Sequence, residues 1–515
     1  MASRVNRIFL ALILLIGLAG PSAAQSPSAS PASSQATATG GTETINIDVN
    51  AAAQPFPHFW EQMFGSGRAI LSLRDSYRKD LDKVEGITGF KYIRFHAILD
   101  DEVGVYSEDA KGQPVYNFSY VDQIYDGLLA HAVKPFVELS FMPKALAASQ
   151  TPHAFWYKPL PNPPRDYDRW GELVYQFTHH LVERYGEDEV AQWYFEVWNE
   201  PNIDFWTGDP KQDTYFELYD HAAPAVKRAS NKLRVGGPAS AQAAWIPQFI
   251  QHCVDKNIPF DFVSTHVYGN DSVENVFHTT GTIPRTEFVC RAAKKVSDEV
   301  RNSPRPQIPI IWSEYNASYF NEPAVTDAAF MGPWLADTIR KCDGLNTIMS
   351  YWDFSDVFEE QGVIKTPFYG GFGLVAEGGV PKPAFNAFAL LHLLGDIRIP
   401  EDNNSILVTR RADGTLVLAV WNLFLPEDAG QPKDVNLVLK GLKGHHHAEI
   451  HQLDAQHGSP LPAYEAMGRP ASPTKEQYEK LTRAAEMPAP QRVNLQQQSL
   501  QLHLPPHALF VVEIR

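Results

Sequence analysis

The chain has 515 residues, a length that suits one large domain with a smaller one better than a single ordinary domain. Its 44% hydrophobic and 20% charged residues are typical of a globular protein and argue against a disordered or fibrous chain. The formal net charge is −16, and because phosphate backbones repel an acidic chain we expect no nucleic-acid partner.

The N-terminus has the pattern of an export signal. Arg4 and Arg7 precede an apolar run over 8–18, and small residues follow at 22–24. This pattern predicts a signal peptide over 1–24. The apolar run is too short to span a bilayer, so we expect a periplasmic or extracellular protein without a stable membrane anchor.

A low-complexity stretch follows, because residues 25–43 are almost all Ser, Pro, Ala, Thr, Gln and Gly. Such a composition cannot bury a core, and we predict a disordered linker. The next segment, 43–49, alternates in the manner of a strand. Two placements are open for it, in the catalytic domain or in the C-terminal domain.

Short β-rich runs alternate with helical stretches between about residues 59 and 395. The predicted strands are 59–66, 91–99, 134–142, 193–198, 234–239, 260–268, 308–315 and 347–354. Several are continuous apolar runs, as expected for parallel strands that are buried on both faces. Eight such repeats predict an α/β fold, a (β/α)₈ TIM barrel, over 44–399.

After residue 399 the pattern changes to short strands with turn residues between them. The predicted strands are 405–409, 415–421, 434–439, 448–453, 500–504 and 508–514. We therefore predict an accessory β-sandwich over 400–515. The Pro-rich stretch 459–490 is interpreted as a long loop or insertion.

Three cysteines occur, Cys253, Cys290 and Cys342. Their spacing does not suggest a zinc site, and Cys253 lies in an apolar, helix-like stretch that predicts a core position. Whether any disulfide forms stays open. The run His445–His447 is interpreted as a solvated segment beside a turn, so we expect no metal and no cofactor.

Two glutamates stand at the ends of predicted barrel strands. Glu200 follows the fourth strand, between Asn199 and Pro201, and Glu314 ends the seventh. The carboxyl ends of barrel strands build the active site. Glycoside hydrolysis needs two carboxyl groups, one to protonate the leaving oxygen and one to meet the developing oxocarbenium ion. The pair therefore predicts a glycosidase, and the amide of Asn199 is placed to bind a substrate hydroxyl.

The stretches around these residues resemble glycoside hydrolase family 39 of clan A, a family of β-xylosidases and α-L-iduronidases. The matching stretches are 92–96, 134–143, 194–202, 264–268, 350–360, 370–374 and 381–386. They cover most of the predicted barrel strands, and the last three resemble the β-xylosidase branch. The resemblance implies a retaining enzyme that removes xylosyl or similar units from an oligosaccharide or glycoside.

The resemblance also implies a role for each residue of the site. Glu200 would be the acid/base and Glu314 the nucleophile, and Asn199 would bind the sugar 2-hydroxyl. The remaining substrate-binding positions would be His96, His266, Tyr268, Glu359 and Glu360. Trp352 is either a platform beside the sugar or part of the core. Glu138, inside the third strand, is interpreted as a buried acid paired with an arginine such as Arg94.

Other functions remain open at this point. The same two glutamates would serve an α-L-arabinofuranosidase or an endo-acting enzyme on an exopolysaccharide. A third hypothesis is a carbohydrate-binding barrel without activity. The sequence leaves the sugar, the linkage and the oligomeric state open, a homo-oligomer included.

Overall fold

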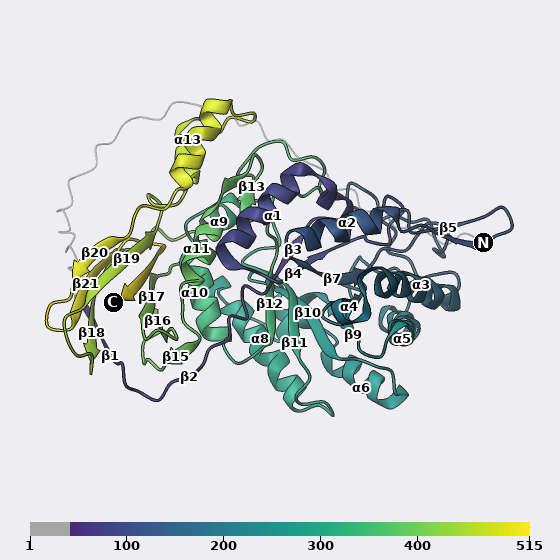
Figure 1. The fold of residues 1–515 in the computed structure, drawn as a ribbon, viewed down its shortest axis with the longest axis horizontal. Helices are drawn as coiled ribbons and strands as arrows, with labels where there is room; N and C mark the ends of the chain where they lie inside the picture. Colours follow the sequence, from purple (N-terminus) through teal and green to yellow (C-terminus); the bar gives the residue numbers. More distant parts are fainter. Residues whose placement is uncertain (1–41) are drawn as a thin grey trace, which may run out of the picture. The chain divides into compact units, whose positions relative to one another are not determined.

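Eight parallel strands close into a barrel in the computed structural model, which describes residues 42–515 (Figure 1). The strands are β3 (Met63–Ser66), β4 (Tyr92–Phe95), β7 (Lys134–Leu139), β8 (Tyr194–Val197), β9 (Arg234–Ser240), β10 (Phe262–Tyr268), β11 (Ile310–Asn316) and β12 (Ile348–Tyr351). Each pairs in parallel with its neighbours in chain order, and β12 closes on β3. The predicted (β/α)₈ barrel is confirmed.

All eight predicted runs contain a barrel strand, but several strands are shorter than predicted. Strand β4 ends at Phe95, because Ala97 takes a left-handed conformation with φ 71° and turns the chain. Strand β3 begins at Met63 and not at residue 59. These early ends matter, since the residues just after a strand are the ones that can face the mouth of the barrel.

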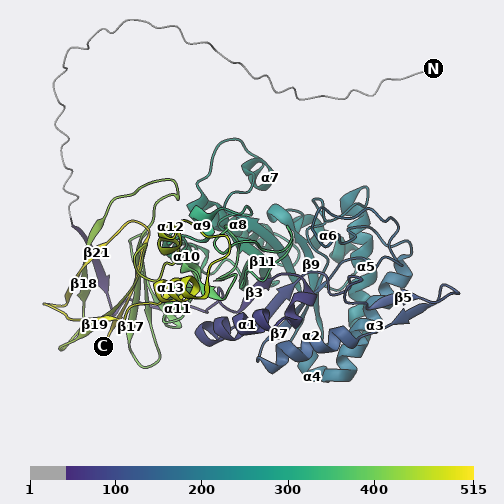
Figure 2. The ribbon, with the colours of Figure 1, turned by 90° about the horizontal axis from the view of Figure 1, so that it is seen from above.

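Helices cover the outside of the barrel (Figures 1 and 2). The longer ones are α1 (Asp75–Thr88), α2 (Ser119–Ala130), α3 (Tyr167–Tyr185), α5 (Lys211–Ala229), α6 (Ile246–Lys256), α8 (Arg285–Arg301), α10 (Met331–Cys342) and α11 (Pro383–Leu391). Short elements lie in the loops: η1 (Ala69–Leu73), α4 (Glu187–Val190), η2 (Ala241–Ala243), α7 (Val273–Phe277), α9 (Pro323–Thr326), and the hairpins β5 (Tyr106–Glu108)–β6 (Pro114–Tyr116) and β13 (Val375–Ala376)–β14 (Val380–Pro381). Among residues 42–515, no helix is long and apolar enough to cross a membrane.

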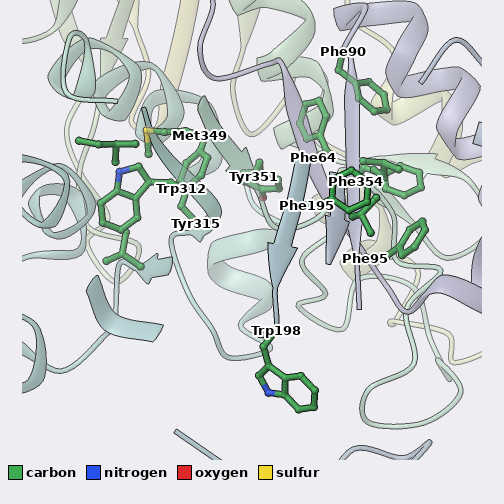
Figure 3. Packing of buried hydrophobic residues seen from close by; sticks show 14 of the residues in the cluster. Phe64, Phe90, Phe95, Phe195, Trp198, Trp312, Tyr315, Met349, Tyr351 and Phe354 are labelled. Carbon is green, nitrogen blue, oxygen red and sulfur yellow. The ribbon is translucent and has the colours of Figure 1, made fainter. Parts of the chain in front are cut away.

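One large apolar core lies between the strands and the helices, and aromatic residues fill much of it (Figure 3). The rings of Phe64 and Phe90 meet edge to face with centroids 5.1 Å apart. Burying large aromatic side chains contributes a great part of the apolar area removed from water. Most of the aromatic side chains therefore lie in the core, and fewer line the cavity at the mouth of the barrel.

Two sheets form the accessory sandwich. The larger has the order β2 (Gln54–Pro55), β15 (Ile397–Ile399), β16 (Ile406–Arg410), β17 (Leu416–Asn422), β22 (Ala508–Ile514), β19 (His447–Leu453), β20 (Gln491–Asn494), and the smaller has the order β1 (Glu43–Asp48), β18 (Lys433–Lys440), β21 (Ser499–Leu504). Strand β1 lies parallel to β18 (Figure 2), so the segment 43–49 belongs to the sandwich and not to the barrel. Strand β15 joins the same domain three residues before position 400.

Of the two interpretations of 459–490, a long loop or an insertion, the helices in this segment favour the insertion. The segment contains α12 (Leu461–Ala466) and α13 (Lys475–Ala485). The side chain of Thr474 caps the first turn of α13, and Gln477 reaches back to the backbone of Thr474. This Thr-x-x-Gln capping box is a sequence signal for a helix start that the Pro-rich composition obscured.

The question left open about disulfides has an answer in the helices. Cys290 of α8 and Cys342 of α10 form a disulfide across 52 residues of chain. Cys253 is a free thiol buried on the inner face of α6, as its apolar surroundings predict. Of the segments before the barrel, the predicted signal peptide and all but the last two residues of the linker lie outside the described residues.

Candidate active site

A cavity of about 380 Å³ opens at the carboxyl end of the barrel strands. Its walls include seven of the residues that the sequence singled out: His96, Asn199, Glu200, Tyr268, Glu314, Trp352 and Glu360. These residues come from five strands or from the turns that follow them, namely β4, β8, β10, β11 and β12. Two others, His266 and Glu359, do not line it.

The turn that carries Glu200 is strained. Strand β8 ends at Val197, and then Trp198 and Glu200 both take left-handed conformations, with φ 74° and φ 44°. Such conformations cost roughly 1–3 kcal/mol for a residue with a Cβ, and they persist only where the surroundings enforce them. Here the backbone N–H of Glu200 donates to the carbonyl of Ala239 at 2.8 Å. This enforced backbone conformation places the Glu200 carboxyl at the cavity.

Glu200 and Glu314 face each other closely. One oxygen of each carboxyl lies within 4.8 Å of the other and of a ring nitrogen of His266. Retaining glycosidases hold their two carboxyls about 5–5.5 Å apart, whereas inverting enzymes separate them by about 6.5–9.5 Å to admit a water. The spacing therefore fits direct attack by one carboxylate.

Glu314 receives a hydrogen bond on each oxygen. Arg94 Nη1 donates to Oε1 at 2.7 Å, and the hydroxyl of Tyr268 donates to Oε2 at 2.5 Å. An ionised carboxylate is an acceptor only, so two donors of this kind match the anion and orient it. Because Tyr268 is buried beside Glu314, the pKa of its phenol is raised well above its usual range, which keeps the hydroxyl as a donor.

Arg94 is fully buried beneath the cavity and organises four side chains. Besides Glu314, its guanidinium contacts Glu138 at 2.8 Å, Glu196 at 2.6 Å and Asn199 Oδ1 at 2.9 Å. The predicted pairing of Arg94 with Glu138 is confirmed. The bonds to Glu314 and Asn199 were not predicted, and they make Arg94 the support of both. With its oxygen held by Arg94, the amide nitrogen of Asn199 is left to donate to a ligand.

A chain of hydrogen bonds leads from Glu200 into the barrel. His266 Nδ1 lies 3.0 Å from a Glu200 oxygen, and its Nε2 lies 3.1 Å from Ser313 Oγ. Ser313 uses its own proton to donate to Glu196 at 2.6 Å. Its oxygen must then accept from His266 Nε2–H.

The protonation of His266 decides that of Glu200. Burial, with Arg94 and His96 nearby, lowers the pKa of His266 well below its usual range, so the imidazole is neutral and carries one proton. With that proton on Nε2, Nδ1 can only accept, and the partner that donates to it is a protonated Glu200.

The electrostatics of Glu200 agree with this assignment. Burial raises the pKa of its carboxyl well above the usual range, and the neighbouring carboxylates of Glu314 and Asp271 add to the rise. A proton on Glu200 and a charge on Glu314 are the states in which one group acts as acid and the other as nucleophile.

Another part of the wall combines an aromatic ring with acids. The rings of Trp352 and His96 lie 4.8 Å apart, and both line the cavity, so the position of Trp352 favours the platform over the core interpretation. His96 Nδ1 contacts Glu138 at 2.7 Å, and its Nε2 lies 3.7 Å from Glu360. Burial and the charge of Glu314 raise the pKa of Glu360 well above its usual range.

The adjacent glutamate points elsewhere. Glu359 forms ion pairs with Arg68 at 3.0 Å and Arg74 at 2.7 Å, outside the cavity lining. Each oxygen of Glu359 thus accepts from an arginine, and of the two adjacent glutamates only Glu360 lines the cavity. His266 is likewise not among the lining residues, and its Nδ1 lies 3.0 Å from a Glu200 oxygen.

Several lining residues carried no signal in the sequence. His153, Phe205, Gln242, Asp271 and Tyr319 come from loops after different strands. Their positions depend on loop paths, which periodicity does not reveal.

Two groups of His and carboxylate side chains within 42–515 are close enough to ligate a cation: Glu200–His266–Glu314 and His58–Glu61–His392. In the first group, hydrogen bonds already account for the contacts of the two glutamates. The second lies at the opposite end of the barrel, before β3 and after α11.

Comparison with known proteins agrees with the geometry. Residues 43–497 match Glycosyl hydrolases family 39. The chain is 38% identical to a β-xylosidase of Geobacillus stearothermophilus over 452 residues, 86% of this chain and 89% of that protein. It is 36% identical to a β-xylosidase of Caldicellulosiruptor saccharolyticus, covering 92% and 98% of the two chains. A crystal structure of a monomeric β-xylosidase from Caulobacter crescentus CB15 superposes with a TM-score of 0.84 at 31% identity, covering 92% of this chain and 99% of that one.

Proposed function

The chain belongs to glycosyl hydrolases family 39 and is a retaining, β-xylosidase-like glycoside hydrolase, and we propose that Glu200 and Glu314 carry its chemistry on β-linked xylosyl units. The observation that supports these roles most is the close pair of carboxyls, one held as an anion by Arg94 and Tyr268, the other raised in pKa. Asn199, His96, Trp352 and Glu360 would bind the xylosyl ring.

In the first step, Glu314 attacks the anomeric carbon while Glu200 donates its proton to the glycosidic oxygen. The bond to the leaving alcohol breaks, and a covalent glycosyl ester forms on Glu314. Arg94 and Tyr268 keep the attacking carboxylate oriented. Asn199 donates to the sugar 2-hydroxyl, a contact that strengthens as the oxocarbenium character develops.

In the second step, Glu200 acts as a base instead of an acid, and Glu314 becomes the leaving group. Once Glu314 is an ester it carries no charge, so one cause of the raised pKa of Glu200 disappears. Glu200, now ionised, takes a proton from a water that attacks the anomeric carbon. The ester bond to Glu314 breaks, and two inversions leave the product with the original β configuration.

The roles of the two glutamates can be distinguished by how the effect of each substitution depends on the leaving group of the substrate. Glu314→Gln should lower kcat/KM on every aryl β-xyloside by about 10³-fold or more, because the nucleophile is lost. Glu200→Ala should cost about 10²–10⁴-fold with a poor leaving group and much less with a dinitrophenolate, which departs without a proton. Steady-state kinetics on a leaving-group series measures both.

The control is Glu274→Gln, a glutamate in the loop helix α7 that does not line the cavity. It should leave the whole series unchanged. Equal losses for Glu200→Ala across all leaving groups would contradict its role as the acid, and an α-anomeric first product by NMR would contradict retention.

We also propose that the protein is exported. Arg4, Arg7 and the apolar run 8–18 support it, as does the Cys290–Cys342 disulfide, since disulfides persist in oxidising compartments. Protein purified from the periplasm or medium should begin at Gln25. Full-length protein confined to the cytoplasm would overturn the proposal.

A further inference from the structure

The loop between β9 and α6 is the most strained part of the cavity wall. Ala239, near the end of β9, and Gln242, Ala243 and Trp245 of the loop all have positive φ, at 51°, 59°, 53° and 65°. None of them is glycine, so each bears the steric cost of the left-handed region, roughly 1–3 kcal/mol. A cost of this size within seven residues requires that surrounding contacts impose this conformation.

Those contacts come from the turn that carries Glu200. The Asn202 side chain donates to the carbonyl of Ala241 at 3.0 Å and accepts from the N–H of Ala241 at 2.8 Å. The carbonyl of Ala239 accepts from the N–H of Glu200 at 2.8 Å. The strained loop is thus fastened to the acid/base turn at two points, so its side chains keep a fixed position relative to Glu200.

Within this loop, Gln242 has a defined amide orientation. Its Oε1 accepts from Asn275 Nδ2 at 2.8 Å, so its nitrogen faces the other way. Asp271 lies nearby, and its Oδ2 accepts from the backbone N–H of Tyr268 at 2.8 Å. Burial raises the pKa of the Asp271 carboxyl to about 7, and the Tyr268 N–H and the Gln242 side chain act against that rise. Gln242 and Asp271 both line the cavity. The amide nitrogen carries a second hydrogen, and the carboxyl has further acceptor capacity.

The chemistry decides which part of the cavity these residues face. The acid must reach the glycosidic oxygen, so the leaving group lies on the side of Glu200. That side is built by the loop after β8, the strained loop after β9 and the segment after β10 that holds Asp271. The xylosyl ring would then lie against Trp352, His96 and Glu360, which are neighbours in the cavity wall.

We propose that Gln242 and Asp271 are specificity-determining residues, which bind the hydroxyl groups of a sugar leaving group and so favour such a leaving group over one without hydroxyls. The inference rests on the proposed function. A donor and an acceptor held side by side suit a vicinal diol, and a leaving group without hydroxyls would not satisfy the buried Asp271 carboxyl or the half-buried Gln242 amide. The left-handed backbone conformation of the loop places the Gln242 side chain at the cavity.

The test compares two substrates in one variant. Gln242→Ala should lower kcat/KM for a β-1,4-linked xylose disaccharide at least about tenfold more than kcat/KM for 4-nitrophenyl β-xyloside, whose leaving group has no hydroxyls to bind. Asn202→Ala, which frees the loop, should show the same selective loss. Gln251→Ala, on the exposed face of α6, is the matched control and should leave the ratio of the two values unchanged.

The outcomes separate this inference from the proposed function. Equal losses on both substrates, or no loss on the disaccharide in a Gln242→Ala protein of wild-type Tm, would overturn the leaving-group site. A wild-type protein without activity on the aryl xyloside would instead overturn the proposed function. A crystal structure of Glu200→Gln with the disaccharide should place the second sugar within hydrogen-bond distance of Gln242.

Discussion

At the scale of single residues, one arginine holds the site together. Arg94 is the shared donor of Glu314, Asn199, Glu196 and Glu138, and it lies beyond the reach of solvent. Burying one cation among several carboxylates is tolerable only when each bond has good geometry. We infer that substitutions of Arg94 disturb folding and activity together, so the neighbours of Glu200 are better probes of the chemistry.

Ser313 is such a probe, because it fixes the tautomer of His266. In Ser313→Ala the imidazole can place its proton on Nδ1 and donate to the ionised Glu200. The anion is then favoured, so the pKa of Glu200 falls. The high-pH limb of kcat/KM, where the acid loses its proton, should move to lower pH by about 0.5–1 unit.

The matched control is Ser350→Ala on β12, a buried barrel serine whose hydroxyl has no hydrogen-bond partner within 42–515. Its pH profile should coincide with that of the wild type. A high-pH limb that stays in place in Ser313→Ala, or moves upward, would contradict the relay.

At the scale of elements, the ends of the barrel strands determine which side chains reach the cavity. Close packing between neighbouring strands determines the orientation of those side chains. Gly65 on β3 lies against Trp352, which follows β12. A Cβ on Gly65 would lie 2.2 Å from the ring of Trp352. Only glycine leaves room for the indole at this point, next to His96, so a backbone position outside the cavity determines the shape of its wall.

Gly65→Ala should therefore displace Trp352 and lower kcat/KM on an aryl xyloside by about 100-fold, since small misplacements of a substrate-positioning group are costly. Gly86→Ala is the control. It lies in α1 with open space around its Cβ position, and it should raise stability by about 0.5–1 kcal/mol without affecting activity. Wild-type kinetics in Gly65→Ala would show that the ring is free to move.

The sequence predicted the barrel well because eight apolar runs have only one common arrangement, and Glu200 and Glu314 were found because they follow such runs. The helix α13 was missed although Thr474 and Gln477 signal its start, since proline content outweighed a two-residue motif. Gln242 could not be found, because its place depends on left-handed backbone angles at residues that rarely adopt them. The sequence could not tell which of Glu359 and Glu360 lines the cavity, because adjacent residues in a loop can face opposite ways.

At the scale of the whole molecule, a crosslink joins two of the barrel's outer helices. The disulfide between Cys290 and Cys342 restricts the unfolded chain over 52 residues. Its loss, in Cys342→Ser, should lower the free energy of unfolding by about 2–4 kcal/mol.

Denaturant unfolding with and without a thiol reductant measures this effect. The reduced wild type should match Cys342→Ser, and the variant should not respond to reductant. Equal stability of oxidised and reduced wild type would contradict a stabilising role for the bond.

The place of the last strand has a consequence for biogenesis. Strand β22, which ends at Ile514, lies in the middle of the larger sandwich sheet, between β17 and β19, while β1, the first described strand, pairs with β18. The smaller sheet cannot be completed before β21 has been made, nor the larger before β22, although the barrel strands are synthesised much earlier. The barrel strands can therefore begin to pair while both sheets of the sandwich still lack a strand.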